Sequence, residues 1–408
     1  MRFILITIFF SSCVLGGDLP VLSGVVNGFA VDVYQKVEKK QNFCYSPYAL
    51  HAALSMIEVG AEKRTRDELY AGLKLLGERG DTVIQHANVY GDMVERYSRE
   101  LPKQLEGKED PLDLFLLNRI YLSQQRNYER DYLEIGRDVA GYGMEKKDFE
   151  RDHQRIQKQV NAWVAHESFQ RIENALPENA VRKDTSLLLL NGLFFQAPWH
   201  EPFDVKLTKP GGFHLHDGKV VQVPMMQREG KYGYLANSSW TAISLPFGQY
   251  SECHLVLIVP KVVDGLSGLE QNLKAKDLMD MRDLPQRTLR LHMPRFELKG
   301  ESQPLMPALK GLGIKRAFDD PKGSAELTQI DATRNTVLGP VYQKSYFKID
   351  EMGCDVLKAS SAVLLDRVFE QPGRGFEFKA DRAFLFLVQD CRTGIVLFMG
   401  RVVDPRAH

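Results

Sequence analysis

Apolar residues in the first half of the chain recur at three- and four-residue spacing. This spacing is clear over residues 25–37 and 48–59, and again over residues 148–169, where Ile156, Val160, Trp163 and Val164 fall on one face. Such a period matches the α-helix, in which residues three and four apart share a face. The pattern therefore predicts three amphipathic or buried helices before residue 170.

After about residue 184 the pattern changes to short apolar runs separated by turn residues. Strand-length runs that are apolar at consecutive positions are typical of strands buried on both faces. The clearest predicted strands are residues 187–195, 220–223, 255–259, 289–293, 383–388 and 395–399. The turn sequence DCRTG at 390–394 joins the last two as a hairpin. With no repeat and no Gly/Ser- or Pro-rich linker, we predict an α+β protein with one compact domain over residues 18–408.

The first seventeen residues read as a secretory signal peptide. Arg2 precedes the apolar run 3–10, and the small-residue stretch 11–17 follows it. A charged start, a short apolar segment and small residues at the exit are typical of signal peptides, and the run is too short to span a bilayer. We therefore expect residues 1–17 to be removed and the protein to be secreted and extracellular, with no membrane association.

Charge and composition narrow the classes of partner that we expect for the protein. Fifty-three basic and 53 acidic residues balance to a formal net charge of zero, which gives no electrostatic reason to expect nucleic-acid binding. Cys13 leaves with the signal peptide, and Cys44, Cys253, Cys354 and Cys391 are too scattered for a disulfide scaffold, although they allow two bridges. Asn237 begins an Asn-Ser-Ser glycosylation triplet, so we expect a glycoprotein.

No enzyme signature is present in the sequence. It lacks a GxSxG elbow, a phosphate-binding P-loop, a GxGxxG fingerprint and an HExxH helix. His214 and His216 would share one face of a strand, as metal ligands can, but no third ligand follows nearby. We therefore expect no enzyme activity, no metal and no cofactor.

Several motifs together resemble the serpin family over nearly the whole mature chain. In family order they are SPYAL at 46–50, ALSM at 53–56, NAWV at 161–164, LNGLFF at 190–195 with Trp199, VPMM at 223–226, LPF at 245–247, MPRF at 293–296 and FMGRVVDP at 398–405. The resemblance implies a serpin fold with three β-sheets, about nine helices and an exposed reactive loop, here residues 351–376. It also implies inhibition by a conformational trap, in which the cleaved loop inserts as a strand into the main sheet.

The resemblance places the reactive bond sixteen residues after Glu351, at Arg367–Val368. An arginine at this position suits a trypsin-like serine protease, whose specificity pocket is acidic. Arg374 is the alternative, and it would require a longer loop. We expect the protein to act as a monomer on such a protease.

The start of the loop, called the hinge, departs from the usual family pattern. Gly353 and Ala359 suit a segment that must slide into a sheet, and Cys354 is small, whereas Val356 and Lys358 are atypical. Strand alternation puts Cys354, Val356, Lys358 and Ser360 on one face, and the resemblance implies that this face turns inward on insertion. Burying an unpaired lysine there is costly.

The residues that the family uses where its main sheet opens are mostly present. Ser46, Asn191 and Trp199 match, and Arg295 is placed to pair with Glu351. Ala49 stands where the family usually has serine, and Gln343 stands where it has histidine. Because glutamine both donates and accepts hydrogen bonds, we expect an altered network to survive.

Two functions stay open at this point: an inhibitor of trypsin-like proteases, and a non-inhibitory serpin that binds, transports or chaperones. The region from Arg96 to Lys108, which often binds heparin in this family, mixes acidic and basic residues. We therefore expect it to be a solvated helix without high affinity for heparin.

Overall fold

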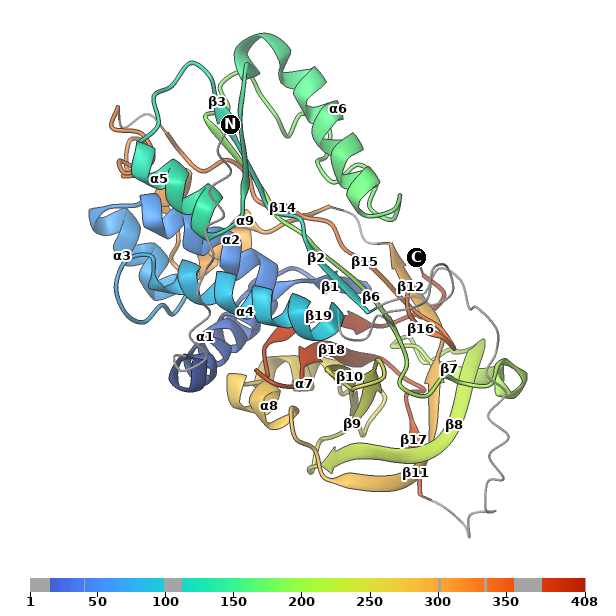
Figure 1. Ribbon diagram of the computed structural model, residues 1–408. Coiled ribbons are helices and arrows are strands. Elements are labelled where there is room, and N and C mark those ends of the chain that lie inside the picture. The colour runs from blue at the N-terminus through green and yellow to red at the C-terminus, as the bar shows by residue number, and fades with distance from the viewer. Residues whose placement is uncertain are drawn as a thin grey trace.

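The computed structural model describes residues 15–39, 41–98, 112–299, 302–333, 336–355 and 376–407. Helices dominate the N-terminal third, as the three- and four-residue spacing predicts (Figure 1). The described residues form nine α-helices: α1 (Leu15–Lys36), α2 (Pro47–Gly60), α3 (Lys63–Gly72), α4 (Asp81–Ser98), α5 (Arg130–Glu134), α6 (Phe149–Glu167), α7 (Leu266–Asn272), α8 (Ala275–Asp280) and α9 (Met306–Gly311). Short π-helical and 3₁₀ turns follow α5 and occur at 205–207 and 316–318.

Helix α2 lies in the core, and every one of its residues is buried. Its start is fixed by Ser46, whose hydroxyl accepts a hydrogen bond from the Ala49 backbone amide at 3.2 Å, and by Pro47 in the first turn. A helix surrounded on all sides by packing has few polar positions, as the sequence 47–60 shows. Helix α2 is therefore held in place by packing on all of its sides.

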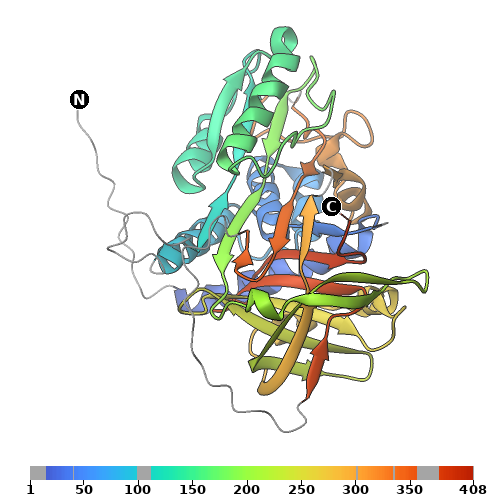
Figure 2. The same cartoon turned by 90° about the vertical axis from the view of Figure 1, so that its right-hand side faces the viewer.

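One nine-stranded sheet and a second group of strands lie in different parts of the molecule (Figures 1 and 2). The larger has the order β1-β19-β18-β10-β9-β8-β11-β17, with β7 paired to β8. Its strands are β1 (Phe43–Tyr45), β7 (Lys209–His214), β8 (Val220–Ala236), β9 (Trp240–Phe247), β10 (Cys253–Pro260), β11 (Gln286–Pro294), β17 (Glu377–Lys379), β18 (Phe384–Asp390) and β19 (Val396–Val402). The antiparallel pairing of β18 with β19 is the predicted C-terminal hairpin.

The other strands form a long sheet in three sections. A five-stranded section has the order β12-β15-β16-β6-β2, a three-stranded section β4-β3-β5, and a pair β13-β14. These strands are β2 (Asp113–Leu116), β3 (Arg119–Ser123), β4 (Gly143–Lys147), β5 (Leu187–Leu190), β6 (Leu193–Pro198), β12 (Phe296–Lys299), β13 (Gln303–Pro304), β14 (Tyr342–Gln343), β15 (Tyr346–Ile349) and β16 (Gly353–Cys354).

The three sections are joined through shared chain segments. Residues 113–123 supply both β2 and β3, and residues 187–198 supply both β5 and β6, so each segment runs through two sections. The described residues therefore form four sheets where three were expected, namely the nine-stranded sheet and the three sections. If the short interruptions between the sections are ignored, the sections count as one long sheet and the total is two. One such interruption falls at Asn191–Gly192, inside the single strand that the apolar run 187–195 predicts.

Helix α6 lies along this long sheet (Figures 1 and 2). Its apolar face, with Ile156, Val160 and Val164, joins the buried Leu188 and Leu190 of β5 in one hydrophobic cluster. Trp163 of α6, and Tyr342 and Tyr346 of the neighbouring segment, pack against the same cluster. Within the described residues, no helix has the length and apolar character needed to cross a membrane.

Candidate functional site

The central seam of the long sheet lies between the segment 187–198 and the segment 342–349. A parallel bridge joins Leu187 to Leu338 at one end of the seam, and β16 separates β6 from β15 at the other end. Between these points, no backbone ladder pairs the two segments in the part of the chain that is described. The facing strand edges therefore have backbone groups that an added strand would pair.

The hinge residues Gly353 and Cys354 already occupy the β16 end of this seam. Gly353 is in register with Pro198 of β6, while Cys354 is in register with both Ala197 of β6 and Ile349 of β15. The Cys354 side chain points inward and the residue is 1% exposed. Burial raises the pKa of its thiol well above the usual range, so Cys354 is unreactive while it is seated.

Gly353 is required by geometry at this position. Its φ of +152° is one that L-residues rarely adopt, and a Cβ there would lie 2.1 Å from the Ala197 carbonyl oxygen. Only glycine allows the hinge backbone to approach β6 this closely.

Glu351 is held at the head of the hinge. Its Oε1 accepts hydrogen bonds from Arg295 Nη2 at 2.5 Å and from Thr208 Oγ1 at 2.7 Å. Burial alone would raise the pKa of Glu351, but these hydrogen bonds outweigh burial and hold the pKa below its usual value. Trp199 lies beside it and donates from Nε1 to the Asp350 carbonyl at 2.8 Å. The structure thus brings Glu351, Arg295 and Trp199 together at the start of the hinge.

The remaining residues of the opening region meet in the middle part of the seam, away from β16. Gln343 Oε1 accepts from the Ser46 amide at 2.8 Å, and Gln343 Nε2 lies 3.2 Å from both the Ser46 carbonyl and Asn191 Oδ1. Asn191 Nδ2 in turn donates to the Ala49 carbonyl at 2.6 Å. Gln343 thus both donates and accepts, and Ala49 takes part through its backbone. The side chains of Gln343 and Asn191 connect the two sides of the seam.

Several predicted site residues lie outside the described residues. These are the reactive bond Arg367–Val368, the alternative Arg374, and the hinge residues Val356, Lys358 and Ala359. They remain predictions from the resemblance. Two residues at the seam were not predicted as site residues: Asp355, the last described residue of the hinge, and Gln196 of β6, which donates to the Asp355 carbonyl at 2.7 Å. Their sequence positions, 159 residues apart, carry no signal of this contact.

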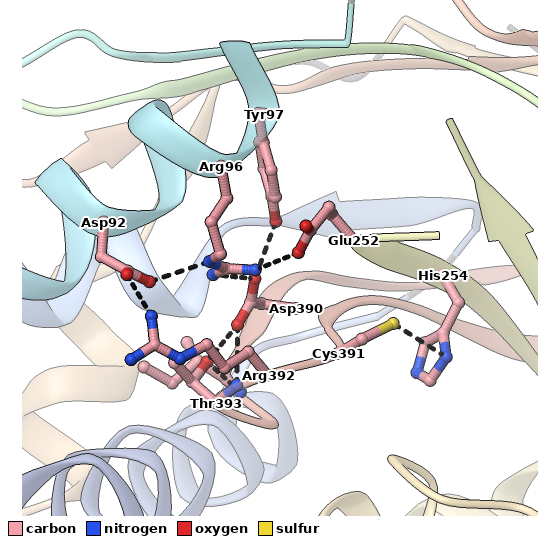
Figure 3. Close-up of polar contacts among 10 residues, drawn as sticks. Asp92, Arg96, Tyr97, Glu252, His254, Asp390, Cys391, Arg392 and Thr393 are labelled. Atoms are coloured by element: carbon pink, nitrogen blue, oxygen red, sulfur yellow. Dashed lines mark hydrogen bonds and ion pairs between the residues drawn. The ribbon is translucent and has the colours of Figure 1, made fainter. Parts of the chain in front are cut away.

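The solvated helix expected from Arg96 onward is wrong for Arg96 itself (Figure 3). Arg96 is 4% exposed, and its guanidinium pairs with Asp92 at 2.9 Å, Glu252 at 2.6 Å and Asp390 at 2.7 Å. Asp390 also accepts from Tyr97 and from Thr393 of the hairpin turn. The end of α4 is therefore attached to the β18–β19 turn, and Arg96 is unavailable to a polyanion. Residues 99–108 lie outside the described residues.

The remaining residues that the sequence analysis singled out, namely the histidine pair, the cysteines and Asn237, do not form a common site. Among the described residues, no group of three or more His, Cys, Asp or Glu side chains is arranged to hold a metal, and His216 instead pairs with Asp264 at 3.3 Å. Cys44, Cys354 and Cys391 are free thiols. Asn237 is exposed in the turn between β8 and β9, where its Oδ1 accepts from the backbone of Ser239 and Trp240.

Comparison with known proteins agrees with this architecture. The chain is 29% identical over 373 residues to Serpin-ZXA of Oryza sativa subsp. japonica, with 90% of each chain covered. It is 27% identical over 391 residues to antithrombin-III of Mus musculus, covering 94% of this chain and 82% of that one. The structure of human thyroxine-binding globulin aligns with a TM-score of 0.79 at 22% identity, over 95% of this chain and 99% of that one. A sequence model of the family Serpin (serine protease inhibitor) matches residues 25–405, and the chain therefore belongs to the serpin family.

Proposed function

We propose that this protein is a secreted inhibitor that traps trypsin-like serine proteases through the bond Arg367–Val368. Most serpins inhibit serine proteases and are not themselves enzymes, whereas some, thyroxine-binding globulin among them, are non-inhibitory. The observation that carries the proposal is the seated hinge: Gly353 and Cys354 already form the first pairs of an inserted strand between β6 and β15.

The chemistry uses the protease's own mechanism. The protease serine Oγ attacks the carbonyl carbon of Arg367, the Arg367–Val368 amide bond breaks, and a serine–Arg367 ester forms. The Val368 nitrogen leaves as an amine after taking a proton from the protease histidine. The freed loop then continues the strand that Cys354 begins, before water hydrolyses the ester.

The seam supplies the driving force for this insertion. An added strand would pair the unladdered edges of residues 187–198 and 342–349, and each net backbone hydrogen bond contributes about 1 kcal/mol. Asn191 and Gln343 bridge the seam by side chains alone, so the strand must displace their contact at 3.2 Å. Helix α6 packs over the same seam, so it must also move aside when the strand inserts.

The test is incubation of the purified protein with trypsin, followed by denaturing electrophoresis and mass spectrometry. A covalent complex of the summed mass, with cleavage mapped to Arg367–Val368, supports the proposal. Cleavage at Arg374 would move the reactive bond to the alternative site. Sequencing the N-terminus of the exported protein tests removal of residues 1–17.

A non-inhibitory binding or transport role is the second candidate. Val356 and Lys358 favour it, because they depart from the small residues that suit insertion. A loop that trypsin cuts without forming any complex, and a cleaved protein that melts no higher than the intact one, would favour this second role.

A further inference from the structure

Asp355 is held from three sides at the point where the hinge leaves the seam. Its amide donates to the Lys348 carbonyl of β15 at 3.1 Å, and its carbonyl accepts from Gln196 Nε2 of β6 at 2.7 Å. Its carboxylate meets Arg171, whose Nε lies 3.0 Å from Oδ1 and 3.1 Å from Oδ2. The residue is 1% exposed, and Arg171 hydrogen-bonds only to Oδ2, so Oδ1 has the charge of Arg171 nearby but no hydrogen-bond partner among the described residues.

The backbone at Asp355 turns out of the strand. Its φ is +46°, in the left-handed region that non-glycine residues seldom occupy. The conformation costs energy unless the surroundings fix it, and the three contacts do so. Asp355 is therefore the place where β16 ends.

Arg171 connects this point to helix α6. It follows the C-terminus of α6 by four residues, and its guanidinium also lies 5.5 Å from the ring centroid of Tyr346 in β15. The other charged groups nearby are Lys348, which pairs with Asp350 at 3.0 Å, and Glu297, which accepts from the Tyr346 hydroxyl. Burial raises the pKa of Asp355, and the hydrogen bond and charge of Arg171 oppose this shift.

We propose that Arg171, Gln196 and Asp355 form a hinge latch that keeps Cys354 seated in the seam and thereby raises the fraction of protease encounters that end in trapping. The second part rests on the proposed inhibitory function. After cleavage, insertion competes with hydrolysis of the ester. In a seated hinge the first strand pairs are already formed before cleavage. The entropic cost of bringing the loop to the sheet is therefore not incurred after cleavage, and insertion begins without a search step. These are positioning residues and do not touch the protease.

The test compares Arg171→Gln and Asp355→Asn with wild type, with Arg171→Lys as a charge-retaining variant. Arg182→Gln is the matched control, because it breaks the exposed Arg182–Asp184 pair in the same segment without touching the hinge. The first readout is the rate of maleimide labelling at Cys354, mapped by mass spectrometry, with buried Cys44 as internal reference. The second is the number of inhibitor molecules consumed per trypsin molecule trapped.

Loss of a charge-assisted hydrogen bond should increase Cys354 labelling about ten- to hundredfold, since labelling follows local opening. Arg171→Lys should recover part of the protection, and Arg182→Gln should match wild type. Trapping should require more inhibitor in both latch variants.

Unchanged Cys354 labelling in Arg171→Gln and Asp355→Asn would overturn the latch. An equal rise at Cys44 would also overturn it, because it would mean general loosening. If wild type traps no trypsin, the inhibitory proposal fails, while the labelling readout still decides whether the latch exists.

Discussion

Replacing Gly353 with alanine tests whether seating of the hinge matters for function. The added Cβ would lie 2.1 Å from the Ala197 carbonyl oxygen and 2.7 Å from Pro198 Cα, where ordinary contacts begin at 3.4 Å. Both are backbone atoms of β6 that no rotamer change can move. We therefore expect the hinge to leave the seam.

The size of the effect follows from this overlap. Forcing one extra carbon into a packed site costs about 3 kcal/mol when the neighbours cannot relax, and the φ of +152° adds strain. A change of this size shifts the ratio of seated to unseated hinge about a hundredfold. Trypsin should then cleave most of the Gly353→Ala protein as substrate, and Cys354 should label much faster than in wild type.

The assay is titration of trypsin with the variant, resolved by denaturing electrophoresis into complex and cleaved bands. Gly268→Ala is the matched control, because a Cβ at Gly268 meets no atom within 4 Å. Thermal unfolding of both variants shows whether the fold is intact. If Gly353→Ala traps trypsin with wild-type stoichiometry, seating of the hinge does not govern insertion and the reasoning is refuted.

Three further predictions concern stability. Gln343→Leu leaves the Ser46 amide without its acceptor and should lower the free energy of unfolding by about 1–3 kcal/mol, measured in urea. Arg96→Met leaves the fully buried Asp390 without its cation and should cost about 3–5 kcal/mol in the same assay. Burial lowers the pKa of His51 to about 4 and that of His86 well below 6.5, so unfolding takes up protons. Stability should therefore fall as pH drops from 6.5 towards 4, by about 3 kcal/mol for His51 alone.

Each of these predictions has its own check. Gln343→His should lose less stability than Gln343→Leu, because the imidazole retains a polar contact; equal losses would contradict the network. Arg130→Met, which removes an exposed pair with Glu134, should leave the free energy of unfolding nearly unchanged. His86→Gln should flatten the decline between pH 6.5 and 4, and an unchanged slope would mean that other groups cause it.

Helices α1, α2 and α6 and strands β5, β6, β8, β10, β11, β18 and β19 were predictable, because their apolar spacing reflects packing of each segment on a core. The other described helices and strands are too short or too mixed in polarity for such a pattern to reveal them. The apolar run at 187–195 nevertheless hid a break, since Asn191 turns its amide to Gln343 and Ala49 and not into a ladder. The run at 220–223 likewise underestimated β8, which extends to Ala236 through a polar stretch. Neighbouring strands satisfy that polar backbone, and a single segment does not reveal its partners.

The residues of the site were likewise predictable only in part. Glu351, Gly353 and Gln343 were placed by resemblance to a family, because motif order carries that information. The latch was not predictable, because Arg171 and Asp355 are 184 residues apart and meet only when the seam forms. Arg96 appeared to be one of several alternating charges, and only the fold brings Glu252 and Asp390 to it. Long-range polar pairs of this kind depend on tertiary structure rather than on local pattern.

The central claim is that the loop inserts between β6 and β15 after cleavage at Arg367–Val368. The most direct measurement is the thermal unfolding of the protein before and after cleavage by trypsin, on material whose cut is mapped by mass spectrometry and whose covalent complex is counted. We predict a trypsin complex and a cleaved form that unfolds at a markedly higher temperature, because the new strand pairs the open seam. A cleaved form that unfolds at the same temperature, with all trypsin left active, would contradict it.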